Sequence, residues 1–134
     1  MPIPKGTILF VKGFPGDFGL CDKFVFVLGH TSPSSILVFT ISSQPRYELQ
    51  PQYKREMVKI PKGTFSFLPV DSWIQCFHHT HELQIGSYSM TVKGSAYDLY
   101  FEDVKRVVRD SDLLNAFQIT DCIDVMDNDK STIL

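Results

Sequence analysis

Short apolar runs punctuate the chain, each rich in β-branched and aromatic residues and bounded by Gly, Pro or polar residues. Runs of this kind predict β-strands. Two of them, residues 23–28 and 36–41, are apolar at nearly every position, which predicts central strands buried on both faces. We therefore expect Val27, Leu28, Ile36, Val38 and Phe39 to share one core. The expected strands are residues 7–11, 23–28, 36–41, 57–60, 65–68 and 72–77.

The segments between these runs have the composition of loops and turns. Residues 13–19 (GFPGDFG) contain three glycines and a proline and are predicted to form a loop. Turns are expected at residues 30–35 and 61–63, and a longer polar excursion at residues 47–56.

The pattern becomes helical after residue 81. Residues 99–110 place Leu99, Val104, Val107 and Val108 at helical spacing, with acids early and bases late, as the helix dipole favours. A second short helix is expected to start near Ser111. The chain is therefore expected to be mainly β, a small barrel or strongly twisted antiparallel sheet with one or two C-terminal helices. We assign residues 1–120 to one domain and residues 121–134 to a flexible acidic tail.

Charge and cysteine content narrow the function classes. Residues 1–109 carry 12 Lys/Arg and 9 Asp/Glu, whereas residues 110–134 carry one Lys and six Asp. So small a basic surplus could accept a polyanion but does not by itself indicate nucleic-acid binding. Cys21, Cys76 and Cys122 are widely spaced, which argues against a disulfide framework and a zinc site. Without a signal-peptide layout or an apolar run of roughly 18 residues, we expect a soluble, cytoplasmic protein with no membrane contact.

Several short motifs follow one another in a recognisable order. The opening strand KGTILFV and a Gly-rich loop precede KFVFVL; then come TISSQ, the sequence DSWI, and a helix led by Gly94 that contains FEDVKRVV. In this order the chain resembles the PemK/MazF-like toxins of toxin–antitoxin systems. The family's second strand has the form R-P-x-V-V-L, so Lys23 and Phe24 depart from it. A lysine neutralises a phosphate as a point charge but does not grip it through two hydrogen bonds.

The resemblance implies an SH3-like or CcdB-like barrel, a homodimer and a cognate antitoxin protein as partner. It also implies sequence-selective cleavage of single-stranded RNA without a metal or cofactor. Lys23 is the candidate for phosphate stabilisation, Ser42 or Ser43 for positioning the phosphate, and His79 for acid–base catalysis. Aromatic and basic residues that could stack bases or follow the phosphate backbone are Phe14, Phe18, Arg46, Lys54, Arg55 and Trp73.

Other interpretations of the same residues remain open. His78, His79 and His81 are either incidental surface residues, an RNA-facing acid–base group or part of a metal site, although no Cys or carboxylate completes a ligand set at suitable spacing. The barrel could also be catalytically silent and bind nucleic acid or a protein, because fold does not determine function. Convergence of Lys23, a serine and a histidine in one groove would favour the enzyme.

Overall fold

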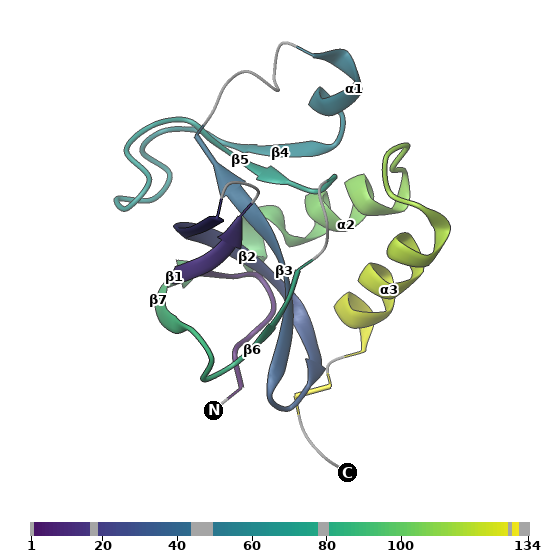
Figure 1. Ribbon diagram of the computed structural model, residues 1–134. Coiled ribbons are helices and arrows are strands. Elements are labelled where there is room, and N and C mark those ends of the chain that lie inside the picture. The colour runs from purple at the N-terminus through teal and green to yellow at the C-terminus, as the bar shows by residue number, and fades with distance from the viewer. Residues whose placement is uncertain (1, 17–18, 44–49, 78–80, 129, 132–134) are drawn as a thin grey trace.

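Seven strands and three helices make up the described part of the computed structural model, which covers residues 2–16, 19–43, 50–77, 81–128 and 130–131 (Figure 1). In chain order the elements are β1 (Thr7–Gly16), β2 (Gly19–Ser32), β3 (Ser35–Ser42), α1 (Pro51–Lys54), β4 (Met57–Ile60), β5 (Ser72–Gln75), β6 (His81–Gln84), β7 (Ser89–Ser95), the π-helical turn η2 (Tyr97–Phe101), α2 (Glu102–Arg109) and α3 (Ala116–Asp127).

The strands form one twisted antiparallel sheet in the order β4-β5-β3-β2-β1-β7, with β6 also paired to β3. One edge of β3 pairs with β2 along its length. Its other edge is divided, because β5 pairs with Ile41 and Ser42 while β6 pairs with residues 35–38. Between the described strands the sheet does not close, since β4 and β7 lie at its two ends. The expected mainly-β, barrel-like fold with C-terminal helices is confirmed.

Several expected element boundaries are wrong. Residues 13–16 and residue 19 belong to β1 and β2, which form one long hairpin, so most of the Gly-rich segment continues the ladder. Residues 65–68 are not a strand but lie in the connection between β4 and β5, and β6 and β7 were not expected. The short helix expected near Ser111 starts later, at Ala116, where Asn115 forms a capping box with Gln118.

The central strands are buried on both faces, as their apolar runs predict. All eight positions of β3 are buried. Because side chains alternate along a strand, they divide between two clusters. Leu28 and Phe39 lie in the cluster that the helices cover, whereas Val27, Ile36 and Val38 lie in a second cluster with Leu83 of β6 and residues of β1. The expectation of one shared core is therefore wrong.

The helix layer approaches the sheet closely at two glycines. A Cβ atom on Gly29 would lie 2.7 Å from the carbonyl oxygen of Val125 in α3. Gly6 has a φ of +82°, and a Cβ atom there would lie 2.6 Å from the Cα atom of Tyr97 in η2. Next to it, the Lys5 ammonium donates a 2.8 Å hydrogen bond to the carbonyl oxygen of Met126. Small residues at these points let the helices seat directly on β2 and the N-terminal segment.

Helix α3 extends into the segment that was expected to be a flexible acidic tail. It runs to Asp127 and buries Cys122, Val125 and Met126 in the helix-covered cluster. Residues 121–127 are thus part of the folded domain. The interpretation as a tail overlooked that the aspartates alternate with apolar residues at helical spacing.

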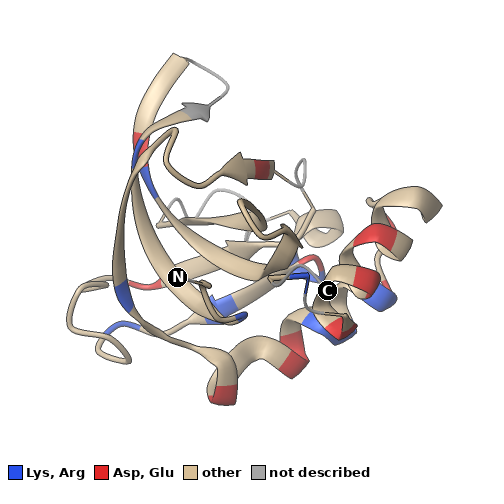
Figure 2. Ribbon diagram, turned by 90° about the horizontal axis from the view of Figure 1, so that it is seen from below, with Lys and Arg blue, Asp and Glu red and all other residues tan. Residues whose placement is uncertain are grey.

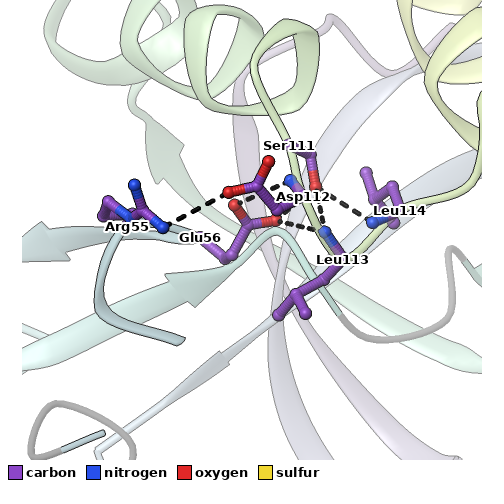
Figure 3. A network of polar contacts seen from close by, with 6 residues as sticks. All are labelled: Arg55, Glu56, Ser111, Asp112, Leu113 and Leu114. Carbon is purple, nitrogen blue, oxygen red and sulfur yellow. Dashed lines mark hydrogen bonds and ion pairs between the residues drawn. The ribbon is translucent and has the colours of Figure 1, made fainter. Parts of the chain in front are cut away.

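A buried carboxylate joins the helix layer to the edge of the sheet (Figure 3). The side chain of Glu56, directly before β4, is only 2% exposed. It accepts hydrogen bonds from the Ser111 hydroxyl and from the backbone amides of Asp112 and Leu113, the latter two at 3.3 Å. These donors lie in the connection between α2 and α3, so one side chain fixes how that connection meets β4. The neighbouring pair Arg55–Asp112 is exposed and contributes little.

Replacing Phe39 tests the double-sided core. Phe39→Ala should lower the free energy of unfolding by about 3–5 kcal/mol, because a fully buried ring leaves a cavity. Urea denaturation measures this, with Phe117→Ala as the matched control, since Phe117 is 85% exposed and should cost less than about 0.5 kcal/mol. Equal midpoints for the two variants would contradict the assignment.

Replacing Glu56 tests the link between the layers. Glu56→Ala should destabilise the fold by about 3 kcal/mol, because three donors lose a charged acceptor in a buried place. Hydrogen exchange should accelerate at the amides of Asp112 and Leu113 in particular. Arg55→Ala is the control and should leave both readouts nearly unchanged. Unaltered exchange in Glu56→Ala would show that the connection is held by other contacts.

Candidate functional site

A hollow of 280 Å³ lies where β3 ends, against β2 and the connection between β4 and β5. Phe10 of β1 and residues 67–70 and 72 line its other sides. Lys23, Ser42 and Ser43 border it as well, so the structure brings together three of the four residues expected to carry catalysis. The lining residues are Phe10, Asp22, Lys23, Phe24, Ile41, Ser42, Ser43, Phe67, Leu68, Pro69, Val70 and Ser72.

Strand register explains why Lys23 and Ser42 are neighbours. Phe24 pairs with Ile41 across β2 and β3, so one further step along the antiparallel ladder sets Lys23 beside Ser42. Alternation turns Lys23 to the opposite face from Phe24. Both residues belong to the lining of the hollow, although their side chains lie on opposite faces of β2.

Lys23 differs from a fully solvated surface lysine in its surroundings. It is half-buried, and its ammonium forms no hydrogen bond or ion pair with any residue that the structure describes. Most lysines on folded proteins are well exposed, because holding the charge away from water is costly. Of the two serines that share the lining of the hollow with Lys23, Ser42 is 9% exposed and Ser43 is exposed.

The row that contains Lys23 and Ser42 continues across the sheet. Ser42 pairs with Trp73 of β5, and Trp73 pairs with Lys59 of β4. The Lys59 ammonium lies 5.7 Å from the centre of the Trp73 ring and 3.6 Å from a carboxylate oxygen of Asp71. Asp71 also accepts a 2.8 Å hydrogen bond from the backbone amide of Lys62. That hydrogen bond and the positive charge of Lys59 lower the pKa of the Asp71 carboxyl group. Because it accepts from the Lys62 amide, the Asp71 side chain joins the two ends of the 61–71 connection.

The aromatic residues at the hollow are not those expected to stack bases. Phe14 and Trp73 are 1% and 6% exposed, so neither ring offers a free face. The hollow instead presents Phe10, Phe24 and Phe67, all half-buried. Sequence reasoning missed them because Phe10 and Phe24 look like ordinary strand residues, although their pairing across β1 and β2 could have been read from the hairpin.

The other expected RNA-binding residues do not gather here. Lys54 is exposed on α1, and Arg55 lines a separate hollow with Glu56 and the end of α2. Phe18, Arg46 and the catalytic candidate His79 lie outside the described residues.

The described histidine of the cluster is not near Lys23. His81 pairs with Val38, four residues along β3 from Ser42 and hence about 13 Å away along the strand. Its ring packs edge-on against Phe14 at 4.8 Å. The convergence of lysine, serine and histidine is thus met for Lys23 and Ser42 but not for His81. Among the described residues, no group of three His, Cys, Asp or Glu side chains could hold a metal ion.

Two of the three cysteines are buried and offer no nucleophile. Cys76 and Cys122 are buried, and burial raises the pKa of both thiols, that of Cys122 to about 12. Neither is ionised near neutral pH, and the thiolate is the reactive form. Cys21 is free and half-exposed at the far part of the β1–β2 hairpin.

In the view of Figure 2, segments with Lys or Arg and segments with Asp or Glu both occur on strands and on helices. No helix in the described ranges is long and apolar enough to cross a bilayer. No protein-family model matches the chain, and no curated protein matches it either. The function must therefore be argued from the hollow and its residues.

The role of Asp71 makes a prediction about pH. Its folded-state pKa lies below the unfolded value of about 3.9, so the carboxylate stabilises the fold above that pH. Wild type should be more stable than Asp71→Asn at neutral pH, and the difference should vanish as the pH falls through the folded-state pKa. Urea midpoints of both proteins across an acidic pH series measure this. A difference that is independent of pH would mean that the charge of Asp71 is not what holds the connection.

Proposed function

We propose that this protein binds single-stranded RNA at the hollow, with one phosphate held by Lys23. The observation that carries the proposal is that half-buried Lys23 lines the same hollow as Ser42 and Ser43, and that its ammonium has no hydrogen bond or ion pair with any residue that the structure describes. A cation without a carboxylate partner attracts an anion, and serine hydroxyls can donate to its free oxygens. The family resemblance supplies the class of anion, since its members act on single-stranded RNA.

Cleavage of the bound strand is the second candidate function, and the meeting of Lys23 with Ser42 and Ser43 favours it. In this reaction the ribose 2′-hydroxyl attacks the adjacent phosphorus, loses its proton to a base, and expels the 5′-oxygen, which takes up a proton. The products are a 2′,3′-cyclic phosphate and a 5′-hydroxyl, and no metal is required. Lys23 would stabilise the charge that grows on the phosphate.

The acid–base residues that cleavage needs have less support than the phosphate-binding residue. Besides Lys23, Asp22 is the titratable residue lining the described hollow, and one of its oxygens already accepts a hydrogen bond from the Gly13 amide. His79 is the other candidate. Binding therefore has more support than catalysis, and we rank the two functions in that order.

The cellular setting follows from the same resemblance. We place the protein in the cytoplasm, as a homodimer regulated by an antitoxin that competes with RNA for the hollow. An acidic segment of such a partner would present carboxylates to Lys23 in place of phosphate.

A binding assay with a charge-matched control tests the function. Wild type should bind a single-stranded uridine oligonucleotide, and Lys23→Ala should weaken binding by at least about tenfold, because a hydrogen-bonded charge pair is lost. Fluorescence anisotropy reports the binding, and the emission of Trp73, the one tryptophan of the chain, reports on the neighbouring row. Arg109→Ala, which removes an exposed charge at the end of α2, should bind like wild type.

The same proteins decide between binding and cleavage. If the second function holds, wild type with EDTA present cuts RNA to products ending in a cyclic phosphate, and Lys23→Ala does not. Binding without cutting across many RNA sequences would leave a binding module. Equal affinities of wild type and Lys23→Ala would contradict the proposed role of the hollow.

A further inference from the structure

Four phenylalanine rings form a continuous ladder, and three of them, Phe10, Phe24 and Phe67, line the hollow. The ring centres of Phe10 and Phe24 are 5.0 Å apart, those of Phe24 and Phe67 are 5.7 Å apart, and those of Phe67 and Phe65 are 5.2 Å apart. The last two pairs are stacked, at interplanar angles of 30° and 25°. The rings come from β1, β2 and the connection between β4 and β5. All four are half-buried and therefore partly accessible to solvent, and Phe24, Phe65 and Phe67 pack against the helix-covered cluster.

Two lysines without a carboxylate partner among the described residues belong to this region, Lys93 at the ladder and Lys23 in the lining of the hollow. Lys93 of β7 places its ammonium 5.9 Å from the centre of the Phe67 ring. Like Lys23, it has no carboxylate partner within the part of the chain that the structure describes. The two lysines lie on β2 and β7, the strands on either side of β1. Aromatic surface bordered by cations suits a ligand that alternates flat apolar groups with negative charges.

The backbone around the ladder leaves room for its rings. A Cβ atom on Gly94 would already contact the Phe67 ring at 3.4 Å, so a larger residue there would crowd it. The 61–71 connection is tied at its base by Asp71 and carries Phe65 and Phe67 toward β7. Asp22 is the carboxylate of the hollow, and it makes the site less attractive to a bare polyanion than to a ligand that also stacks.

We propose that the ladder of Phe10, Phe24, Phe67 and Phe65 is a base-stacking track that takes unpaired nucleobases, while Lys93 contacts a second phosphate. This inference rests on the proposed RNA-binding function and adds how the bases of the RNA are held. Stacking on aromatic rings needs bases that are free of a duplex and tolerates different sequences. The site thereby selects single strands over double strands.

Oligonucleotides with and without bases separate stacking from phosphate binding. A uridine oligonucleotide and an abasic one of the same length carry the same backbone charge. Wild type should bind the uridine strand more tightly, and Phe67→Ala should lose about tenfold in affinity for it while its affinity for the abasic strand stays the same. Phe67→Tyr keeps the ring and should keep the preference. Lys93→Ala should weaken binding of both strands by the same factor.

Controls keep the test independent of folding. Phe117→Ala removes an exposed ring elsewhere and should not change either affinity. Phe65→Ala removes only the outermost ring, which stacks on Phe67, and should reduce the preference for bases even if Phe67→Ala proves unstable.

Two results would overturn the inference, and they have different consequences for the proposed RNA-binding function. If wild type binds both strands equally, or if Phe67→Ala and Phe65→Ala both keep the preference for bases, the stacking track is wrong while RNA binding at Lys23 stands. If wild type binds neither strand, the proposed function fails and the track with it.

Discussion

The structure depends on the burial of β3 and its partner β2 on both faces. A strand that is apolar at every position needs cover on both sides, and α2 and α3 provide it on one side. On the other face, Leu83 of β6 together with residues of β1 provides the cover. Polar side chains are excluded along most of both strands. Strand β3 ends at Ser42, which is still buried, and its neighbour Lys23 in β2 is half-buried.

The strands and helices that could be predicted from the sequence are those whose burial leaves a clear apolar pattern. The runs that became β2 and β3 were evident, because burial on both faces leaves an unbroken apolar pattern. Strand β7 was not evident from the sequence, since all of its positions are exposed or half-exposed. It is held in the sheet by its pairing with β1. A helix over residues 99–110 was expected, but Leu99 is 57% exposed, because the wide turn of η2 shifts the phase and Phe101 faces the core instead.

At the hollow, too, some residues could be identified from local sequence patterns and others only from the folded structure. Lys23 and Ser42 were singled out from a loop–strand junction and a strand end, and register sets them side by side. Trp73 and Phe14 were expected at a surface because aromatic residues bind bases, yet both are buried. The rings that do border the hollow come from three separate segments. Phe67 joins Phe24 only when the 61–71 connection folds over the end of β2, which local patterns do not encode.

These features also determine what kind of RNA binding the hollow can support. For single strands the logarithm of the affinity falls with the logarithm of the salt concentration with a slope of about −0.7 per neutralised phosphate. Lys23 and Lys93 would neutralise two phosphates, and Asp22 opposes them. Binding should therefore depend only weakly on salt, unlike that of a protein with a basic face. Most of the affinity must then come from contacts with the bases, so the aromatic ladder, rather than the net charge of −2, would decide which nucleic acid is held.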